Sequence, residues 1–325
     1  MQPINFLRAI LCALLAGALP AAAQSKDAYP TKPIRAIVPF VPGGPTDIMA
    51  RALAPRLSAV FGKQIIIDNR AGAGGLIAAT MAKEAPPDGY TIFFGTISTL
   101  ATNVATKANL PYDPLRDYAP ITLTSSNPYL MVVHPSVPAQ NVREFIALAK
   151  SQPGKLAFAS SGSGGGAHLA IELFRIMAQI DMLHVPYKGS AQSVTELLAG
   201  QVQMTFNQPS TTIGHAKAGK LRVLGVTSKT RLAAWKDAAP IAEVVPGYES
   251  ASWQGVVAPA KTPKPIIDRL HGEIVKALNT PEFSARLTAE GSEIGGISPE
   301  AFGRFIREEI AKWTKVVKQA KIQVE

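Results

Sequence analysis

Two glycine-rich segments contain most of the residues in this sequence that could do chemistry. In Pro39–Asp47 and in Ser160–His168, an apolar run leads through glycines into an amphipathic stretch. A helix that begins directly after such a turn presents backbone N–H groups without intrahelical acceptors, and glycine lets a ligand approach that backbone closely. Thr46, Ser160 and Ser163 add neutral hydroxyl donors. Two such helix ends facing one cleft are predicted to bind a carboxylate.

The same serines leave a second hypothesis open, an α/β hydrolase. Ser161 or Ser163 would be the nucleophile, since both lie between a predicted strand and a predicted helix. The nucleophile elbow of such enzymes has the pattern Gly-x-Ser-x-Gly. The residue two positions before Ser163 is Ser161 instead of glycine. The motif therefore fails by one residue, and binding without turnover is the preferred interpretation.

No cofactor and no metal ion is predicted. Gly162, Gly164 and Ala167 fit the dinucleotide pattern G-x-G-x-x-A, but the acidic residue that should end the next strand is missing, because Asp181 precedes that strand. The histidines show neither HxH nor HExxH spacing. The basic residues of the last helical segment lack the interleaved aromatic side chains of a nucleic-acid surface, so no nucleic-acid partner is expected.

The N-terminus has the order of a secretory signal peptide, predicted over residues 1–23. Arg8 provides the positive region, Ala9–Leu19 form an apolar stretch, and Ala21–Ala23 supply the small residues of a cleavage site. The single cysteine, Cys12, lies in this segment, so the mature chain would have no disulfide and no cysteine-bound metal. No later run reaches the length of a membrane span. We expect a soluble protein that is exported to the periplasm.

The elements that must position the glycine-rich segments alternate between short strands and amphipathic helices. With 325 residues, 47% of them hydrophobic and 17% charged, the chain can form two domains. The alternation predicts two parallel α/β series, over residues 34–95 and 141–227, followed by a mostly helical C-terminus. Extended segments at 121–133 and 253–258 are predicted to cross between the two lobes. Pro55 predicts a kink or an early end of the first helix.

Several short motifs are spread along the chain. In sequence order they are Val38–Gly44 with Asp47 and Ala50–Arg51, Asn69–Gly75, Pro87–Thr91, Pro153–Lys155, Ser160–His168, His184–Gly189 and Gly219–Arg222. Together they resemble the Bug family, the periplasmic substrate-binding proteins of tripartite tricarboxylate transporters. The resemblance implies the type II periplasmic binding protein fold, two α/β lobes with a hinge of two crossover strands and a cleft between them. Lobe 1 is expected to comprise residues 24–124 and 253–325, and lobe 2 residues 125–252.

The resemblance also implies a function. Members of this family bind small organic acids, commonly di- or tricarboxylates, acidic amino acids or aromatic carboxylates, and deliver them to a membrane permease. We therefore expect a non-enzymatic, monomeric protein that captures a di- or tricarboxylate or an aromatic carboxylate. Its expected protein partner is the permease of a tripartite tricarboxylate transporter. The formal charge of +10 agrees with an acidic ligand.

Carried over position by position, the resemblance places ligand contacts in both lobes. The expected contacts are Pro42, Gly43, Gly44, Thr46 and Asp47 in lobe 1, and Ser160, Gly162, Ser163, Ala167, His168, Tyr187, Lys188, Gly189 and Asn207 in lobe 2. Thr96 and Ser98 are added because they follow a lobe 1 strand at the same sheet edge. Asn207 stands where many relatives have aspartate, which removes a negative charge from the rim of the cleft.

Several of these side chains also have a structural interpretation. Asp47 either contacts the ligand or stabilises the positive end of its helix. His168 begins a helix, where positive charge is unfavourable, and is predicted to be a neutral hydrogen-bonding residue rather than a base. Lys188 either steers an anion or is a solvated surface residue. Tyr187 either stacks on an aromatic acid or packs on the sheet.

Overall fold

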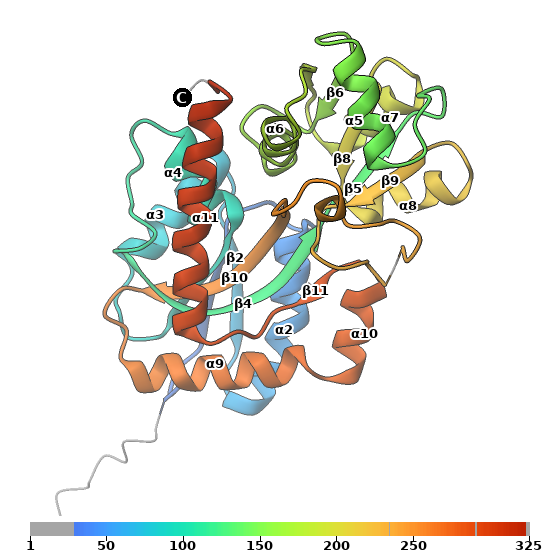
Figure 1. Cartoon of the computed structure of the whole chain (residues 1–325). Coiled ribbons are helices and arrows are strands. Elements are labelled where there is room, and N and C mark those ends of the chain that lie inside the picture. Colours follow the sequence, from blue (N-terminus) through green and yellow to red (C-terminus); the bar gives the residue numbers. More distant parts are fainter. Residues whose placement is uncertain (1–28, 234, 290, 323–325) are drawn as a thin grey trace, which may run out of the picture. The chain divides into compact units, whose positions relative to one another are not determined.

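The computed structural model describes residues 29–233, 235–289 and 291–322 (Figure 1). The predicted signal peptide, residues 1–23, and Cys12 lie outside the described residues. Both β-sheets belong to one compact unit, which begins at Lys32. Among the described residues, no helix combines the length and the apolar composition that a membrane span needs.

The first sheet has six strands in the order β11-β4-β10-β3-β1-β2. These strands are β1 (Ile34–Val38), β2 (Ile65–Asn69), β3 (Thr91–Thr96), β4 (Tyr118–Pro128), β10 (Ala251–Pro259) and β11 (Glu293–Ile294). β1 pairs in parallel with β2 and β3, whereas β10 runs antiparallel to β3 and β4. Ile34, Ile37 and Phe93 of the central strands are fully buried, as expected for a sheet covered on both faces.

The second sheet has five strands in the order β7-β6-β8-β5-β9. These strands are β5 (Leu130–Val133), β6 (Ala157–Ser160), β7 (Leu183–Pro186), β8 (Met204–Asn207) and β9 (Arg222–Val226). β6 pairs in parallel with β7 and β8, whereas β5 runs antiparallel to β8 and β9. The predicted parallel pairing is confirmed for β1–β3 and for β6–β8, whereas β4, β5 and β10, which lie in the segments predicted to cross between the lobes, form antiparallel pairs. These strands carry the chain between the sheets and are not joined to their neighbours by a single crossover helix, so nothing holds them parallel.

The elements of the first sheet form lobe 1, and those of the second sheet form lobe 2. Tyr129 alone separates β4 from β5, so the chain passes directly from one sheet to the other. It returns between β9 and β10. The predicted lobe boundaries, 124/125 and 252/253, fall inside β4 and β10 and stay predictions.

The described helices are α2 (Pro45–Phe61), α3 (Leu76–Glu84), α4 (Asn103–Thr106), α5 (Val142–Ser151), α6 (Gly166–Ala178), α7 (Ser190–Leu198), α8 (Pro209–Lys217), α9 (Lys264–Leu278), α10 (Pro281–Ala289) and α11 (Pro299–Gln319), with the short turns η1 (Ala73–Gly75), η2 (Ser98–Thr102) and η3 (Ile241–Glu243). α2 continues through Pro55 to Phe61, so the predicted early end is wrong. Leu53, Leu57 and Phe61 are buried on either side of the proline, and this packing holds the helix together.

α6 connects the two lobes. Leu169, in its first turns, is fully buried in the same apolar cluster as Ala101 of η2 and Trp313 and Val317 of α11. α11 packs against both β4 and α6. Figure 1 shows α11 crossing β4. The start of α6, although it follows a lobe 2 strand, is therefore anchored on lobe 1 helices.

Candidate ligand-binding site

The loop before α2 is held in shape by the side chain of Asp47, which is 2% exposed. Its Oδ2 accepts hydrogen bonds from the backbone N–H of Gly43 at 2.9 Å and from Nε of Arg51 at 2.8 Å, and its Oδ1 accepts one from Nδ2 of Asn69 at 3.0 Å. Burial alone would raise the pKa of this carboxyl, but the hydrogen bonds from Arg51, Gly43 and Asn69 outweigh that effect and lower the pKa. Both oxygens of Asp47 are thus used within the protein.

A cavity of about 200 Å³, here named the polar chamber, lies where α2 begins. It is lined by Phe40, Pro45, Thr46, Thr96, Ile97, Ser98, Asn127, Gln208, Ser252, Trp253 and Gln254. Gly44 caps α2 with an extended backbone, φ −75° and ψ 165°, and no side chain caps the first N–H groups of this 17-residue helix. These groups have no intrahelical acceptor and attract an anion.

Two side chains in the wall of the polar chamber have unsatisfied polar atoms. Thr96 and Gln254 are 7% and 5% exposed. Within the described part of the chain, Oγ1 of Thr96 and Oε1 of Gln254 have no hydrogen-bond partner. A buried polar atom without a partner costs about 1–3 kcal/mol, so a ligand that supplies the missing hydrogen bond recovers free energy.

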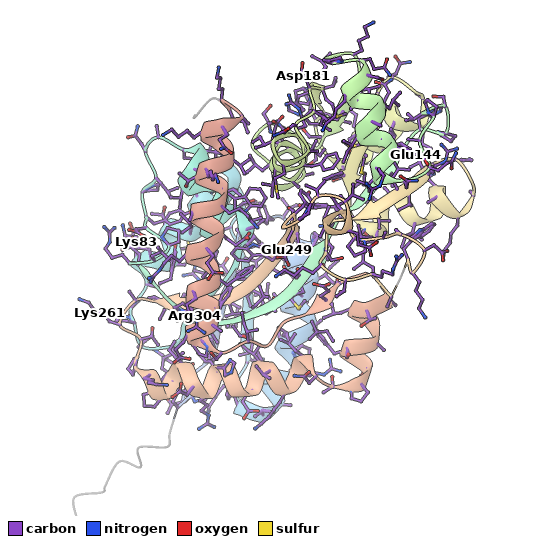
Figure 2. The ribbon with its side chains drawn as sticks, viewed as in Figure 1. Lys83, Glu144, Asp181, Glu249, Lys261 and Arg304 are labelled. Carbon is purple, nitrogen blue, oxygen red and sulfur yellow. The ribbon has the colours of Figure 1, made fainter. Side chains whose placement is uncertain are left out.

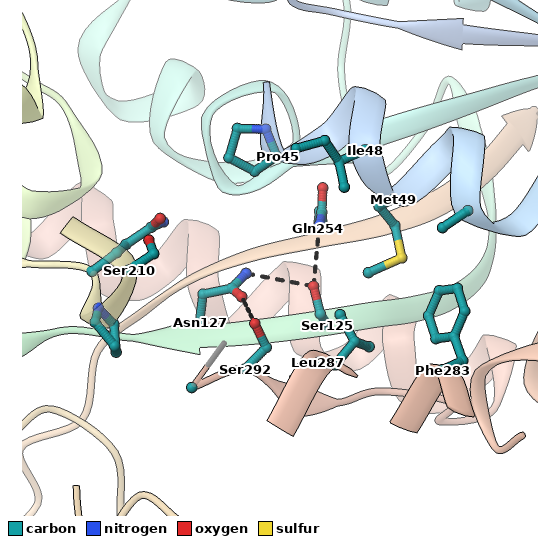
Figure 3. A pocket seen from close by; sticks show the side chains of 14 residues that line it. Pro45, Ile48, Met49, Ser125, Asn127, Ser210, Gln254, Phe283, Leu287 and Ser292 are labelled. Carbon is teal, nitrogen blue, oxygen red and sulfur yellow. Dashed lines mark hydrogen bonds between the residues drawn. The ribbon is translucent and has the colours of Figure 1, made fainter. Parts of the chain in front are cut away.

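A second cavity of about 340 Å³, here named the apolar chamber, adjoins the first (Figure 3). The two chambers share Pro45, Asn127, Gln208 and Gln254 in their walls. The apolar chamber is further lined by Ile48, Met49, Ala52, Ser125, Pro209, Ser210, Phe283, Leu287, Gly291 and Ser292. None of the described residues that line either chamber is charged. The labelled charged side chains of Figure 2, such as Lys83, Asp181 and Lys261, belong to other parts of the molecule.

The helix end that lobe 2 contributes to the chambers is that of α8. Gln208 is its N-cap, and Ser210 lies in its first turn. Asn207 supports this turn, because its Oδ1 accepts hydrogen bonds from the backbone N–H of Gln208 at 3.1 Å and from Oγ1 of Thr211 at 3.0 Å. Sequence reasoning named Asn207 but missed Gln208 and Ser210. The available signal was Pro209, because proline after a strand favours the first position of a helix.

The glycine-rich turn of lobe 2 lines a different cavity of about 200 Å³, here named the glycine-loop cavity. Ser163, Gly164 and Gly165 form part of its wall, and lobe 1 contributes residues of η2 and α4. This cavity and the polar chamber have Phe40 and Ser98 in common. The two cavities therefore adjoin at these two residues, with the lobe 1 glycine-rich turn lining the polar chamber and the lobe 2 turn lining the glycine-loop cavity.

Two histidines hold the glycine-rich turn of lobe 2. Nδ1 of His168 accepts a hydrogen bond from the backbone N–H of Gly164 at 2.9 Å, which requires this nitrogen to be unprotonated. Nε2 of His184 lies 2.7 Å from Oγ of Ser160, whose residue has no exposed surface. Burial and the neighbouring His168 lower the pKa of His184 to about 4. Both imidazoles thus act as structural supports of the turn.

The serines of this turn do not form the site of a hydrolase. Ser160 has a histidine partner, but it is completely buried and cannot reach a substrate. Among the described residues, neither Ser161 nor Ser163 forms a hydrogen bond to a histidine. A serine nucleophile needs such a base within hydrogen-bond reach.

Some of the predicted ligand contacts line these cavities, and others do not. Thr46, Thr96 and Ser98 line the polar chamber, and Ser163 and Ser98 line the glycine-loop cavity. The following lie outside these walls: Pro42, Gly43, Gly44, Asp47, Ser160, Gly162, Ala167, His168, Tyr187, Lys188, Gly189 and Asn207. Tyr187 is tied to the lobe 2 turn, because its backbone N–H donates to the carbonyl of Ser160 at 3.0 Å. Lys188 is exposed beside it.

Comparisons with known proteins agree with this architecture. Residues 49–322 match the family described as tripartite tricarboxylate transporter family receptor. The protein BugT of Bordetella pertussis is 34% identical over 96% of this chain and 97% of its own length. An R. palustris protein solved with adipate is 38% identical, with a TM-score of 0.77 over 91% of this chain and 99% of that one. MatC from Rhodopseudomonas palustris, solved with bound malate, is 29% identical, with a TM-score of 0.72 over 89% of this chain and 100% of that one.

The family explains both the two-lobed fold and the complete burial of Ser160, the serine of the lobe 2 turn that has a histidine partner. The chain belongs to the tripartite tricarboxylate transporter receptor family, which includes the Bug proteins, and it is a solute-binding protein rather than an enzyme.

Proposed function

We propose that this protein binds a small organic carboxylate in the polar chamber and delivers it to the permease of a tripartite tricarboxylate transporter. The observation that carries the proposal is the meeting of unsatisfied polar side chains, Thr96 and Gln254, with the uncapped start of α2. A carboxylate accepts hydrogen bonds from the backbone N–H of Thr46 and from the hydroxyl of Thr96. Its negative charge is favoured by the helix dipole without a buried lysine or arginine.

Gln254 can complete the binding of a carboxylate by turning its amide. Nε2 of Gln254 donates to Oγ of Ser125 at 3.2 Å, which leaves Oε1 without a partner. When the amide turns by 180°, the Ser125 hydroxyl donates to Oε1, and Nε2 becomes a donor for the ligand. The buried oxygen is then satisfied, and the ligand gains a hydrogen bond.

The fold supports a role in transport. The polar chamber takes Thr46 and Thr96 from lobe 1 and Gln208 from lobe 2. A ligand that contacts both lobes favours the closed arrangement through those contacts, and a permease can recognise that arrangement. The solved relatives with adipate and malate support a carboxylate as the ligand. The signal-like residues 1–23 support a periplasmic location. We propose that the protein acts there as a monomer.

The replacement Thr96→Val tests this proposal, with Thr91→Val as its matched control. Both threonines are buried in β3, but Thr91 begins the strand and lies outside the chambers. Isothermal titration with a panel of adipate, malate, citrate, hexanoate and benzoate identifies the acids that bind.

For these acids, Thr96→Val should weaken binding by about tenfold, because one hydrogen bond to a charged group is lost. It should leave the melting temperature unchanged or higher, because an unsatisfied hydroxyl is removed from the interior. The control should keep the native affinity. The proposal is wrong if no carboxylate of the panel binds, or if both variants bind as tightly as the native protein.

A further inference from the structure

We infer that the ligand is a monocarboxylate with an apolar body, whose carboxylate lies in the polar chamber and whose aliphatic or aromatic body fills the apolar chamber. This inference rests on the proposed function and specifies the chemistry of its ligand. The two chambers share four wall residues, so a ligand anchored at the start of α2 extends naturally from one into the other.

The end of the apolar chamber that lies away from the polar chamber is lined by apolar side chains. Met49 of α2 and Phe283 and Leu287 of α10 lie together at one side in Figure 3, whereas Ser210, Asn127 and Ser292 lie at the other. The side chains at the far end are 3%, 5% and 8% exposed for Met49, Phe283 and Leu287. An apolar ligand group that displaces water from such a wall gains about 0.8 kcal/mol per methylene.

The polar groups of the apolar chamber bind mainly to one another. The hydroxyl of Ser292 is hydrogen-bonded to Oδ1 of Asn127, and Nδ2 of Asn127 donates to Oγ of Ser125 at 3.4 Å. Ser125 in turn accepts from Gln254. This network extends across β4, β10 and the segment before β11 without a free charged partner. A second carboxylate placed at this network would have to break it to find donors.

No cation in the described structure is placed to neutralise a second carboxylate. The guanidinium of Arg56 lies 5.4 Å from the centre of the Phe283 ring, but Arg56 does not line the chamber. Its Nη2 is already 2.8 Å from a carboxylate oxygen of Glu282. An ionised carboxylate in an apolar cavity without a counter-charge is strongly disfavoured, so the walls select against di- and tricarboxylates that reach this far.

Hexanoate and adipate test the inference directly, because both have six carbons and differ only in the second carboxylate. Titration of the native protein should show hexanoate binding at least about tenfold more tightly than adipate. Along the series butyrate, hexanoate and octanoate, affinity should rise by about fourfold per buried methylene until the chamber is full.

Two replacements in α2 test whether the apolar chamber causes the rise in affinity with the chain length of the acid. Ala52→Phe fills the apolar chamber, whereas Ala59→Phe adds the same ring at an exposed position of the same helix that lines neither chamber. Ala52→Phe should remove most of the gain from butyrate to octanoate, and Ala59→Phe should preserve it.

The outcomes separate this inference from the proposed function. If adipate, malate or citrate binds more tightly than hexanoate, and Thr96→Val weakens that binding, the polar chamber is confirmed and the apolar-body inference is wrong. The inference is equally wrong if Ala52→Phe binds octanoate like the native protein. If no carboxylate binds, both proposals fail.

Discussion

The imidazole rings of His168 and His184 stack with their centroids 3.8 Å apart and their planes 10° from parallel. His168 belongs to the first turn of α6 and His184 to β7, so the pair ties the start of a helix to the neighbouring strand. The pair also holds the glycine-rich turn, through Gly164 on one side and Ser160 on the other. Two imidazoles at this distance repel each other when both are protonated.

The stacked pair predicts that the protein loses stability in mild acid. Burial and His168 lower the pKa of His184 to about 4 in the folded protein, whereas the unfolded chain has the ordinary value of 6.5. At pH values between these two, His184 is protonated in the unfolded chain but not in the folded protein. The free energy of unfolding therefore falls as the pH falls from about 6.5 to about 4. The expected contribution is on the order of 1–2 kcal/mol.

Urea unfolding at pH 7 and at pH 4.5 measures this effect. His184→Gln keeps a polar group near Ser160 but does not titrate, so it should flatten the pH dependence in this window. His215→Gln, in α8 and outside the stacked pair, should retain the native dependence. An equally steep loss of stability in His184→Gln would assign the acid sensitivity to other groups.

Because Asp47 holds the loop before α2, we expect its replacement to lower both the stability of the protein and its affinity for a carboxylate. Asp47→Asn removes the charge that accepts hydrogen bonds from Gly43, Arg51 and Asn69. We expect a loss of about 1–3 kcal/mol in the free energy of unfolding, because buried donors lose an acceptor. We also expect weaker carboxylate binding, because the start of α2 is less well held.

Chemical denaturation and titration of the same sample check both parts. Asp268→Asn is the control, since Asp268 is half exposed and pairs with Lys264 on the surface, where such pairs contribute little. Native stability in Asp47→Asn would show that this carboxylate does not hold the loop.

The two glycine-rich turns should respond differently to alanine. Gly162 has φ +139°, a conformation that residues with a side chain rarely adopt, so Gly162→Ala should cost about 1–3 kcal/mol. Gly44 has φ −75°, and an added Cβ would lie 3.5 Å from the carbonyl oxygen of Val41, an ordinary contact. Gly44→Ala should change stability by less than about 0.5 kcal/mol. Thermal melts compare the two, and equal melting temperatures would contradict this account of the turns.

Sequence patterns predicted the helices and strands well, because the spacing of hydrophobic residues and the positions of turn residues are local properties of the chain. The predicted first helix is α2, and the extended segments at 121–133 and 253–258 are the strands that carry the chain between sheets. The antiparallel pairing of β10 was not predictable in this way, because it depends on which strand the returning chain meets. The same limit applies to α10, whose Phe283 and Leu287 face a cavity only after the whole chain has folded.

The site was predicted in part for the same reason. The start of α2 with Thr46, and Thr96 at the end of β3, follow from the rule that ligands bind beyond the carboxyl ends of parallel strands. The lobe 2 turn satisfies the same rule and lines the adjoining glycine-loop cavity. Gln208 and Ser210 of α8 line the chambers instead, and the local signal for this helix start was Pro209.

A crystal structure of the protein with its tightest carboxylate tests the central claim most directly. The account predicts carboxylate oxygens within hydrogen-bond distance of the Thr46 backbone N–H and of Oγ1 of Thr96, in the polar chamber. A carboxylate bound instead against Ser163 and Gly164 in the glycine-loop cavity, with the polar chamber holding only water, would contradict it.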